Sequence, residues 1–239
     1  MSVGTIVFPG EAVNVTSDAE NVIRLGAGLY SSEEGVIATK AGLVRCEKEQ
    51  GKYHVDGSQK RYIPGVEDMV LGVITEKGSE WYKVDIGASN LAQLSAIAFD
   101  GATRRNKPNL NVGTLVYCRV IEANRDMDPE ISCESTVGKK DWVTGESTFG
   151  EIKGGYMCKV PLVLAQRLLD GRAPVLEILG RSIPYELAIG ANGRVWVNAE
   201  RPSNTVAIAN AIQNSTFLDE AECEQMVGLV LSKLSQAGE

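Results

Sequence analysis

The stretch from Arg61 to Cys133 constrains the fold most strongly. It consists of short β-branched and aromatic runs separated by glycine and polar clusters, a pattern typical of strands in a small sheet. Gly72 lies inside the first run, where a glycine usually marks a β-bulge or a barrel corner. Five such strands fit a closed barrel of the OB type, a fold that serves as a platform for oligonucleotides. We expect four of them at 61–74, 81–86, 112–120 and 131–134, and the third of the five before Asp100.

The first 60 residues contain short apolar runs with tight turns between them, and they predict a small N-terminal β domain. Such a short segment has little core of its own, so we expect it to pack on a neighbour. The expected strands are 5–8, 22–25, 35–38 and 42–46.

From residue 151 the pattern changes to a mixture of strands and helices, and two helices are expected to begin with a proline in the first turn. The first six elements are strand, helix, helix, strand, strand and helix, which is the order of a KH domain, and a second helix follows them. The expected elements are 156–160, 161–169, 174–179, 185–189, 194–197, 203–212 and 218–234. The chain should therefore be multidomain and β-rich, with a β domain at 1–60, an OB-fold β-barrel at 61–147 and an α/β KH-type domain at 148–239. Residues 138–141 belong to the expected linker.

Composition limits the classes of function. No apolar run approaches the roughly eighteen residues of a membrane span, and no basic region precedes an apolar run at the N-terminus. We therefore expect a soluble intracellular protein. The five cysteines are scattered without a C-x-x-C pair, and there is one histidine. Neither a disulfide framework, a zinc site nor a charge-relay triad is expected, and we predict no metal and no cofactor.

The net charge of −7 argues against general affinity for nucleic acid, for which a basic domain is usual. The charge is uneven, however, because residues 60–110 hold seven Lys or Arg and six Asp or Glu, while the rest of the chain is acidic. The densest basic cluster, Arg104, Arg105 and Lys107, lies there on a loop restrained by Pro108. Three cations within four residues suit phosphate contacts that do not read sequence, although charge alone favours a solvated loop.

Trp81 and Tyr82 are adjacent in an expected strand, so they should point to opposite faces of the sheet. One should enter the core, and the other could stack on a base and contribute about 1–3 kcal/mol. The sequence leaves the assignment open. Core positions for both residues are the simpler expectation, and Trp81 is the candidate platform.

The segment Asp126-Met-Asp128-Pro-Glu130 is acidic but lacks the glycine and the spacing of a calcium loop. We expect a solvated hairpin turn there.

Two glycine motifs bear on the KH-type domain. A KH domain clamps four nucleotides with a GXXG loop between its first two helices, and that position holds Gly171-Arg-Ala-Pro174. The proline removes an N–H and stiffens the backbone that should approach phosphate. The intact motif, Gly190 to Gly193, lies between two strands, where Asn192-Gly193 is a hairpin signal. We expect a structural turn at Gly190, Asn192 and Gly193, and a scaffold role for the domain.

Several motifs carry a resemblance to a known family. Asp68-x-Val-x-Gly-Val-Ile74, followed by Val112-Gly-x-x-Val-x-x-Arg-Val120, resembles an S1-type RNA-binding domain. Arg61-Tyr-Ile-Pro before the barrel and Ile189-Gly-Ala-Asn-Gly-Arg-Val-Trp-Val197 after it are similar to the smaller S1/KH cap subunits of the eukaryotic RNA exosome. The resemblance extends over nearly the whole chain, from Phe8-Pro-Gly10 to the C-terminal helix.

This resemblance implies a non-catalytic subunit that binds single-stranded RNA without sequence specificity. It implies that residues 1–60 dock on a ring of RNase-PH-like subunits, beside other cap subunits, and that the S1 domain faces the pore through which RNA reaches an associated exonuclease. RNA contact is then expected at Arg104, Arg105 and Lys107, and the 190–193 turn should pack the KH domain against S1. The implied location is nucleus, nucleolus and cytoplasm, without a membrane.

Two alternatives remain open. The chain could be a free-standing S1/KH RNA-binding protein of RNA metabolism or translation, although its acidic balance and the altered KH loop count against this. It could also be a nuclease, but metal-dependent hydrolysis usually needs converging carboxylates, and no spaced Asp/Glu set stands out.

Overall fold

The computed structural model describes residues 5–14, 23–26, 28–33, 35–47, 51–57, 59–124, 126–135 and 148–236. The chain forms two compact units, Met1–Gln59 and Lys60–Glu239. The expected linker at 138–141 and the first residue of the expected strand at 22–25 lie outside the described residues. Within the described part of the chain, no helix has both the length and the apolar character needed to cross a bilayer.

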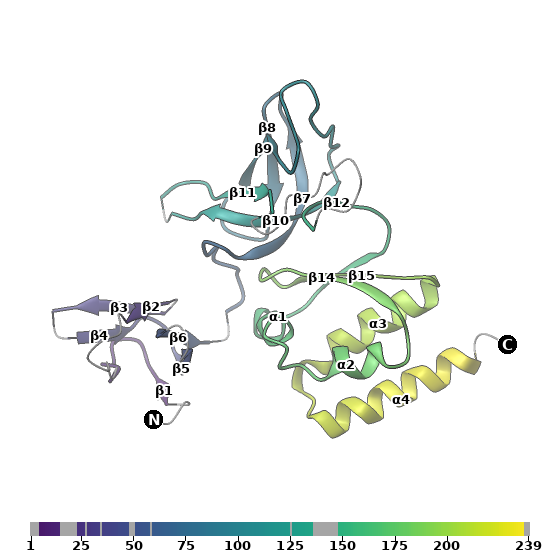
Figure 1. The fold of residues 1–239 in the computed structure, drawn as a ribbon. Helices are drawn as coiled ribbons and strands as arrows, with labels where there is room; N and C mark the ends of the chain where they lie inside the picture. The colour runs from purple at the N-terminus through teal and green to yellow at the C-terminus, as the bar shows by residue number, and fades with distance from the viewer. Residues whose placement is uncertain are drawn as a thin grey trace. The chain divides into compact units, whose positions relative to one another are not determined.

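The N-terminal unit is built on a four-stranded sheet with the order β1-β5-β6-β2 and on a separate hairpin of β3 and β4 (Figure 1). Its core is small, and the buried apolar residues at its centre are Val7, Leu29, Ala38 and Val55. The sequence predicted β1, β2, β4 and β5 but missed β3 and β6, because polar residues interrupt their apolar pattern. The strands are β1 (Ile6–Val7), β2 (Arg24–Leu25), β3 (Leu29–Ser32), β4 (Gly35–Ala38), β5 (Gly42–Glu47) and β6 (Lys52–Asp56).

The second unit begins with five strands that close into a barrel (Figure 1). They are β7 (Met69–Lys77), β8 (Trp81–Asp85), β9 (Ala92–Phe99), β10 (Leu115–Glu122) and β11 (Glu130–Cys133). β11 pairs in parallel with β9 and antiparallel with β10, and it thereby joins the two ends of the sheet β9-β8-β7-β10. Alternate side chains of the strands, such as Val70, Val84 and Leu94, fill the interior. The predicted five-stranded OB-type barrel is confirmed.

Gly72 does not mark a β-bulge, which was one of the two roles expected for it, and it has a steric role in the barrel. It pairs regularly with Val116 of β10, and the shift of register in β7 lies further along, between Ile74 and Glu76. A Cβ at position 72 would come within 2.3 Å of Cγ1 of Val84. The glycine therefore allows neighbouring strands of the barrel to pack closely.

The barrel sheet continues beyond residue 147, the predicted end of the domain. β12 (Gly150–Ile152) pairs antiparallel with Leu115–Tyr117 of β10. Next to it, the rings of Phe149 and Tyr117 stack with centroids 5.3 Å apart. The domain borders themselves stay a prediction.

The C-terminal part has the predicted KH order of elements, and this prediction is confirmed. β14 and β13 flank β15 in an antiparallel sheet, and the helices lie on one side of it (Figure 1). Buried aliphatic residues of the helices, including Leu164, Leu179 and Ile208, form its core with the sheet. The elements are β13 (Tyr156–Lys159), α1 (Leu162–Leu169), α2 (Val175–Gly180), β14 (Tyr185–Ile189), β15 (Arg194–Ala199), α3 (Pro202–Asn214), the 3-10 helix η2 (Ser215–Phe217) and α4 (Glu220–Gln236).

Candidate nucleic-acid interface

The outer surface of strands β8 and β9 forms a continuous polar and aromatic face. Residues of β8 alternate between core and surface, with Tyr82 3% exposed and Trp81 44% exposed. The expectation that both aromatics are core residues is therefore wrong for Trp81. Trp81, the candidate stacking platform, is the residue that faces solvent. Across the pair of strands, Trp81 lies opposite Ser95 and Lys83 lies opposite Gln93. We call these four residues, with the exposed Ile97, the β8–β9 face.

Tyr82 fixes the basic loop (residues 100–109) to the start of β8. Its hydroxyl donates a hydrogen bond of 2.9 Å to the carbonyl of Pro108, and both residues are buried. Inside the loop, Thr103 and Asn106 exchange backbone hydrogen bonds of 2.8 and 3.1 Å and form a tight turn. Arg104 and Arg105 are the two central residues of that turn. The loop is thus an ordered projection of the barrel, and its cations are held at one end of β8.

The cations of the basic loop are in different situations. Arg104 and Arg105 are exposed, and neither has an ion pair with another described residue. Lys107 donates to the carbonyl of Ser79, in the turn just before Trp81. The structure therefore brings the predicted cations and the predicted aromatic platform to the same end of the barrel.

Lys77 is a further cation of this region that the sequence analysis missed. It ends β7, and its Nζ donates to Oδ1 of Asn109 at 2.5 Å. The sequence signal was present, because a lysine at the end of the first strand must lie near the turn into the second. Lys77 thus places a further cation of β7 next to the basic loop.

Asp128 was expected in a solvated turn, but it contacts the β8–β9 face. Its Oδ2 accepts hydrogen bonds from Nζ of Lys83 at 3.0 Å and from Nε2 of Gln93 at 3.2 Å. These contacts hold the pKa of Asp128 below its ordinary value, with the Lys83 hydrogen bond as the main cause. Within the described residues, no group of three or more His, Cys, Asp or Glu could hold a metal ion.

The 190–193 turn fastens the KH domain to the barrel. Asn192 donates from Nδ2 to the carbonyls of Leu71 and Ile86, each at 2.8 Å, and its Oδ1 accepts from the N–H of Leu71 at 3.4 Å. A Cβ at Gly190 would come within 2.8 Å of the same N–H. Gly193 has φ of +75°, which favours glycine, and a side chain there would meet the carbonyl of Val160. All three residues of the motif thus have structural tasks.

Arg194 continues this junction and ties it to β8. Its guanidinium is buried, and it donates to Oδ2 of Asp85 at 2.6 Å and to the carbonyl of the same residue. Burial tends to raise the pKa of Asp85, but the hydrogen bonds from Arg194 and from the N–H of Gly87 outweigh it and lower the pKa. Because Asp85 ends the strand that begins with Trp81, these contacts anchor the KH domain to the far end of β8.

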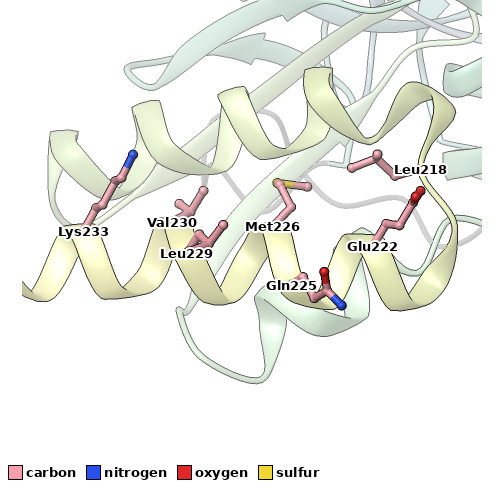
Figure 2. A pocket seen from close by; sticks show the side chains of 7 residues that line it. All are labelled: Leu218, Glu222, Gln225, Met226, Leu229, Val230 and Lys233. Atoms are coloured by element: carbon pink, nitrogen blue, oxygen red, sulfur yellow. The ribbon is translucent and has the colours of Figure 1, made fainter.

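Two other surfaces of the C-terminal part differ from a nucleotide clamp. In the loop between α1 and α2, Arg172 is ion-paired with Asp170, and Pro174 immediately precedes α2. A hollow along α4 is lined by apolar and mixed-charge side chains (Figure 2). The lining residues are Leu218, Glu222, Gln225, Met226, Leu229, Val230 and Lys233. Neither surface combines an exposed aromatic with a basic loop, as the barrel does.

Comparison with known proteins finds matches along most of the chain. Three family profiles match consecutive segments: "Exosome complex exonuclease Rrp40 N-terminal domain" at residues 23–61, "Exosome complex component RRP40, S1 domain" at 62–143, and "KH domain" at 155–203. A crystal structure of a protein assigned as an exosome complex RNA-binding protein superimposes with a TM-score of 0.61 and 17% identity. It covers 74% of this chain and 99% of its own length, and it shows a shared fold.

Proteins of similar sequence match over almost the whole chain. An exosome complex component rrp40 of Dictyostelium discoideum is 46% identical, over 92% of this chain and 90% of its own length. The exosome complex component RRP40 of Drosophila melanogaster is 40% identical, over 93% and 92%. With identity at this level from the N-terminal domain to the KH domain, the chain belongs to the RRP40 family of exosome complex components.

Proposed function

We propose that this chain is a non-catalytic, RNA-binding cap subunit of the RNA exosome. It docks on the ring of RNase-PH-like subunits beside the other cap subunits and guides single-stranded RNA into the central channel. An associated exonuclease then degrades or processes the RNA in the 3'–5' direction. The observation that carries the proposal is the exposed Trp81 beside an ordered basic loop, on the strands that bind oligonucleotides in OB-folds.

The chemistry of this surface suits passage of RNA rather than tight capture. An exposed indole can stack on any base, because every base has a π-face, and this contact is tolerant of sequence. Arg104, Arg105 and Lys107 can contact phosphates, whose positions do not depend on sequence either. The chain as a whole carries a charge of −7, so long-range attraction of RNA is weak. Other subunits must complete the positive channel.

The N-terminal unit offers support for docking on the ring. Ile6 is 66% exposed and Phe8 is 60% exposed, while Val7 between them is buried. Large apolar residues gathered on a surface mark interaction sites in soluble proteins. In this proposal the two side chains are covered by a ring subunit.

Reconstitution of the exosome with a charge-reversed basic loop tests the proposal. We expect Arg104→Glu, Arg105→Glu and Lys107→Glu together to leave folding and entry into the complex unchanged, because the two arginines are exposed and Lys107 makes one surface hydrogen bond. The length of RNA protected from an added ribonuclease should shorten, because phosphate contacts are lost. The matched control reverses Arg172, Arg181 and Lys233, which are exposed cations of the KH domain.

The same experiment separates the alternatives. Protection that is unchanged in the loop variant would show that the loop is ordinary solvated surface. A chain that binds RNA but does not enter the complex would favour a free-standing RNA-binding protein. Hydrolysis of RNA by the purified chain with magnesium or manganese would contradict the non-catalytic assignment.

The nuclear, nucleolar and cytoplasmic location belongs to the same proposal, and imaging of a tagged chain would check it.

A further inference from the structure

Asp128 contacts the β8–β9 face at its cation, Lys83. Lys83 is the cation of this face, and it points to the same side of β8 as Trp81, two residues away. Its ammonium is held 3.0 Å from Oδ2 of Asp128, and the same oxygen accepts from Gln93 at 3.2 Å. A carboxylate oxygen that receives two such donors imitates the phosphate oxygen that the donors could bind.

The fold holds Asp128 in this place independently of its side-chain contacts. The N–H of Gln93 donates to the carbonyl of Pro129 at 2.8 Å, and Glu130, which opens β11, is paired in register with Gln93. The backbone on the C-terminal side of Asp128 is therefore fastened to β9 as part of barrel closure. The fold therefore keeps the carboxylate at a high effective concentration beside Lys83. An RNA phosphate in solution must compete with it for the Lys83 ammonium.

We propose that Asp128 is an intramolecular competitor of RNA, which occupies Lys83 and Gln93 until a phosphate displaces it. The inference rests on the proposed function, because it assumes that RNA follows the β8–β9 face. The pair is partly exposed, so the competition is modest and reversible. The competition lowers the affinity of the barrel for RNA. A lower affinity suits a surface along which an RNA strand must move.

Binding of a short unstructured RNA to the full chain at low ionic strength tests the inference. We expect Asp128→Asn and Asp128→Ala to bind about two- to fivefold more tightly than the wild type, because release of an exposed ion pair has an effect of this size. If Lys83 gains a phosphate, the slope of log K against log salt should steepen by about 0.7. Thermal unfolding should be unchanged.

Two controls separate the contact from a general change of charge. Asp126→Asn removes the same charge from an exposed residue of the same loop. It should leave affinity close to that of the wild type. In a chain that already carries Lys83→Met, Asp128→Asn should bring no gain, because the cation that it releases is absent.

The outcomes distinguish this inference from the proposed function. Equal gains from Asp126→Asn and Asp128→Asn, or no gain from Asp128→Asn, would overturn the competitor role. If the charge-reversed basic loop still loses binding in that case, the proposed function stands. No RNA binding by the wild type or by Asp128→Asn would overturn the competitor role, and it would overturn the proposed function as well if the charge-reversed basic loop also left RNA protection by the reconstituted exosome unchanged. A gain confined to Asp128 variants, and abolished by Lys83→Met, is the result that the inference predicts.

Discussion

Trp81 and Tyr82 follow one another in the chain, but β8 places them in different surroundings. Tyr82 lies in the barrel core, and its hydroxyl has a partner in the carbonyl of Pro108. The indole of Trp81 remains 44% exposed beside Ser95 and near Ile97. A large aromatic residue at this level of exposure contributes less to the core than its size allows, and its surface is open to a base.

Trp81→Ala should weaken RNA binding while folding stays intact. Loss of one stacked base corresponds to about 1–3 kcal/mol of binding free energy. The measurement is RNA affinity of the purified chain at low salt, with unfolding followed in parallel. Tyr156→Ala removes a similarly exposed aromatic residue from the KH domain and serves as the control. Equal losses of affinity in the two variants would contradict a stacking role for Trp81.

At the scale of elements, the turn between β14 and β15 connects the KH domain to the barrel. Asn192 satisfies backbone groups of β7 and of the segment after β8, and Arg194 binds Asp85. Asp85 is the last residue of β8, which carries part of the β8–β9 face, and Leu71 lies in the neighbouring strand β7. In the proposed function, the turn acts on RNA binding through the position of the barrel strands.

Asn192→Ala should destabilise the second unit by about 2–3 kcal/mol, because each buried polar group left without a partner costs about 1–3 kcal/mol. The measurement is the free energy of unfolding from denaturant titration. Asn198 lies on β15, the strand that follows the turn, where its amide contacts Glu186 at the surface, and Asn198→Ala should change stability by less than about 0.5 kcal/mol. Equal effects in the two variants would show that the turn does not fasten the domains.

Strands and helices with a clear apolar period could be predicted from the sequence. The barrel strands and the KH order follow from local patterns, because alternate residues of β8 and β10 enter the core. β3 and β6 could not be predicted, since their burial depends on a partner strand rather than on an apolar run of their own. The steric requirement for glycine at position 72 could not be predicted either, because it depends on the side chain of Val84 on the adjacent strand.

At the scale of the whole molecule, the contacts that shape the candidate interface join residues far apart in the chain. Lys83 meets Asp128 across 45 positions, and Arg194 meets Asp85 across 109. No local pattern contains such pairs, so the sequence placed Asp128 in a solvated turn. The basic cluster could be found because it is contiguous, whereas its position beside Trp81 depends on barrel closure and on the Tyr82 hydrogen bond.

The three parts of the chain have different surface features and contacts. The N-terminal unit exposes apolar side chains suited to a protein partner, the KH domain braces the barrel, and the barrel presents an aromatic platform with a few cations. In the proposed function, such a molecule positions an RNA strand by shape and local charge, and bond cleavage takes place in another subunit.

Photocrosslinking of single-stranded RNA to the reconstituted exosome, with the attachment sites mapped by mass spectrometry, tests this account most directly. The account predicts crosslinks on the peptides that contain Trp81 and residues 104–107. Crosslinks confined to the KH loop at 171–174, or found on other subunits while none falls on the barrel, would contradict it.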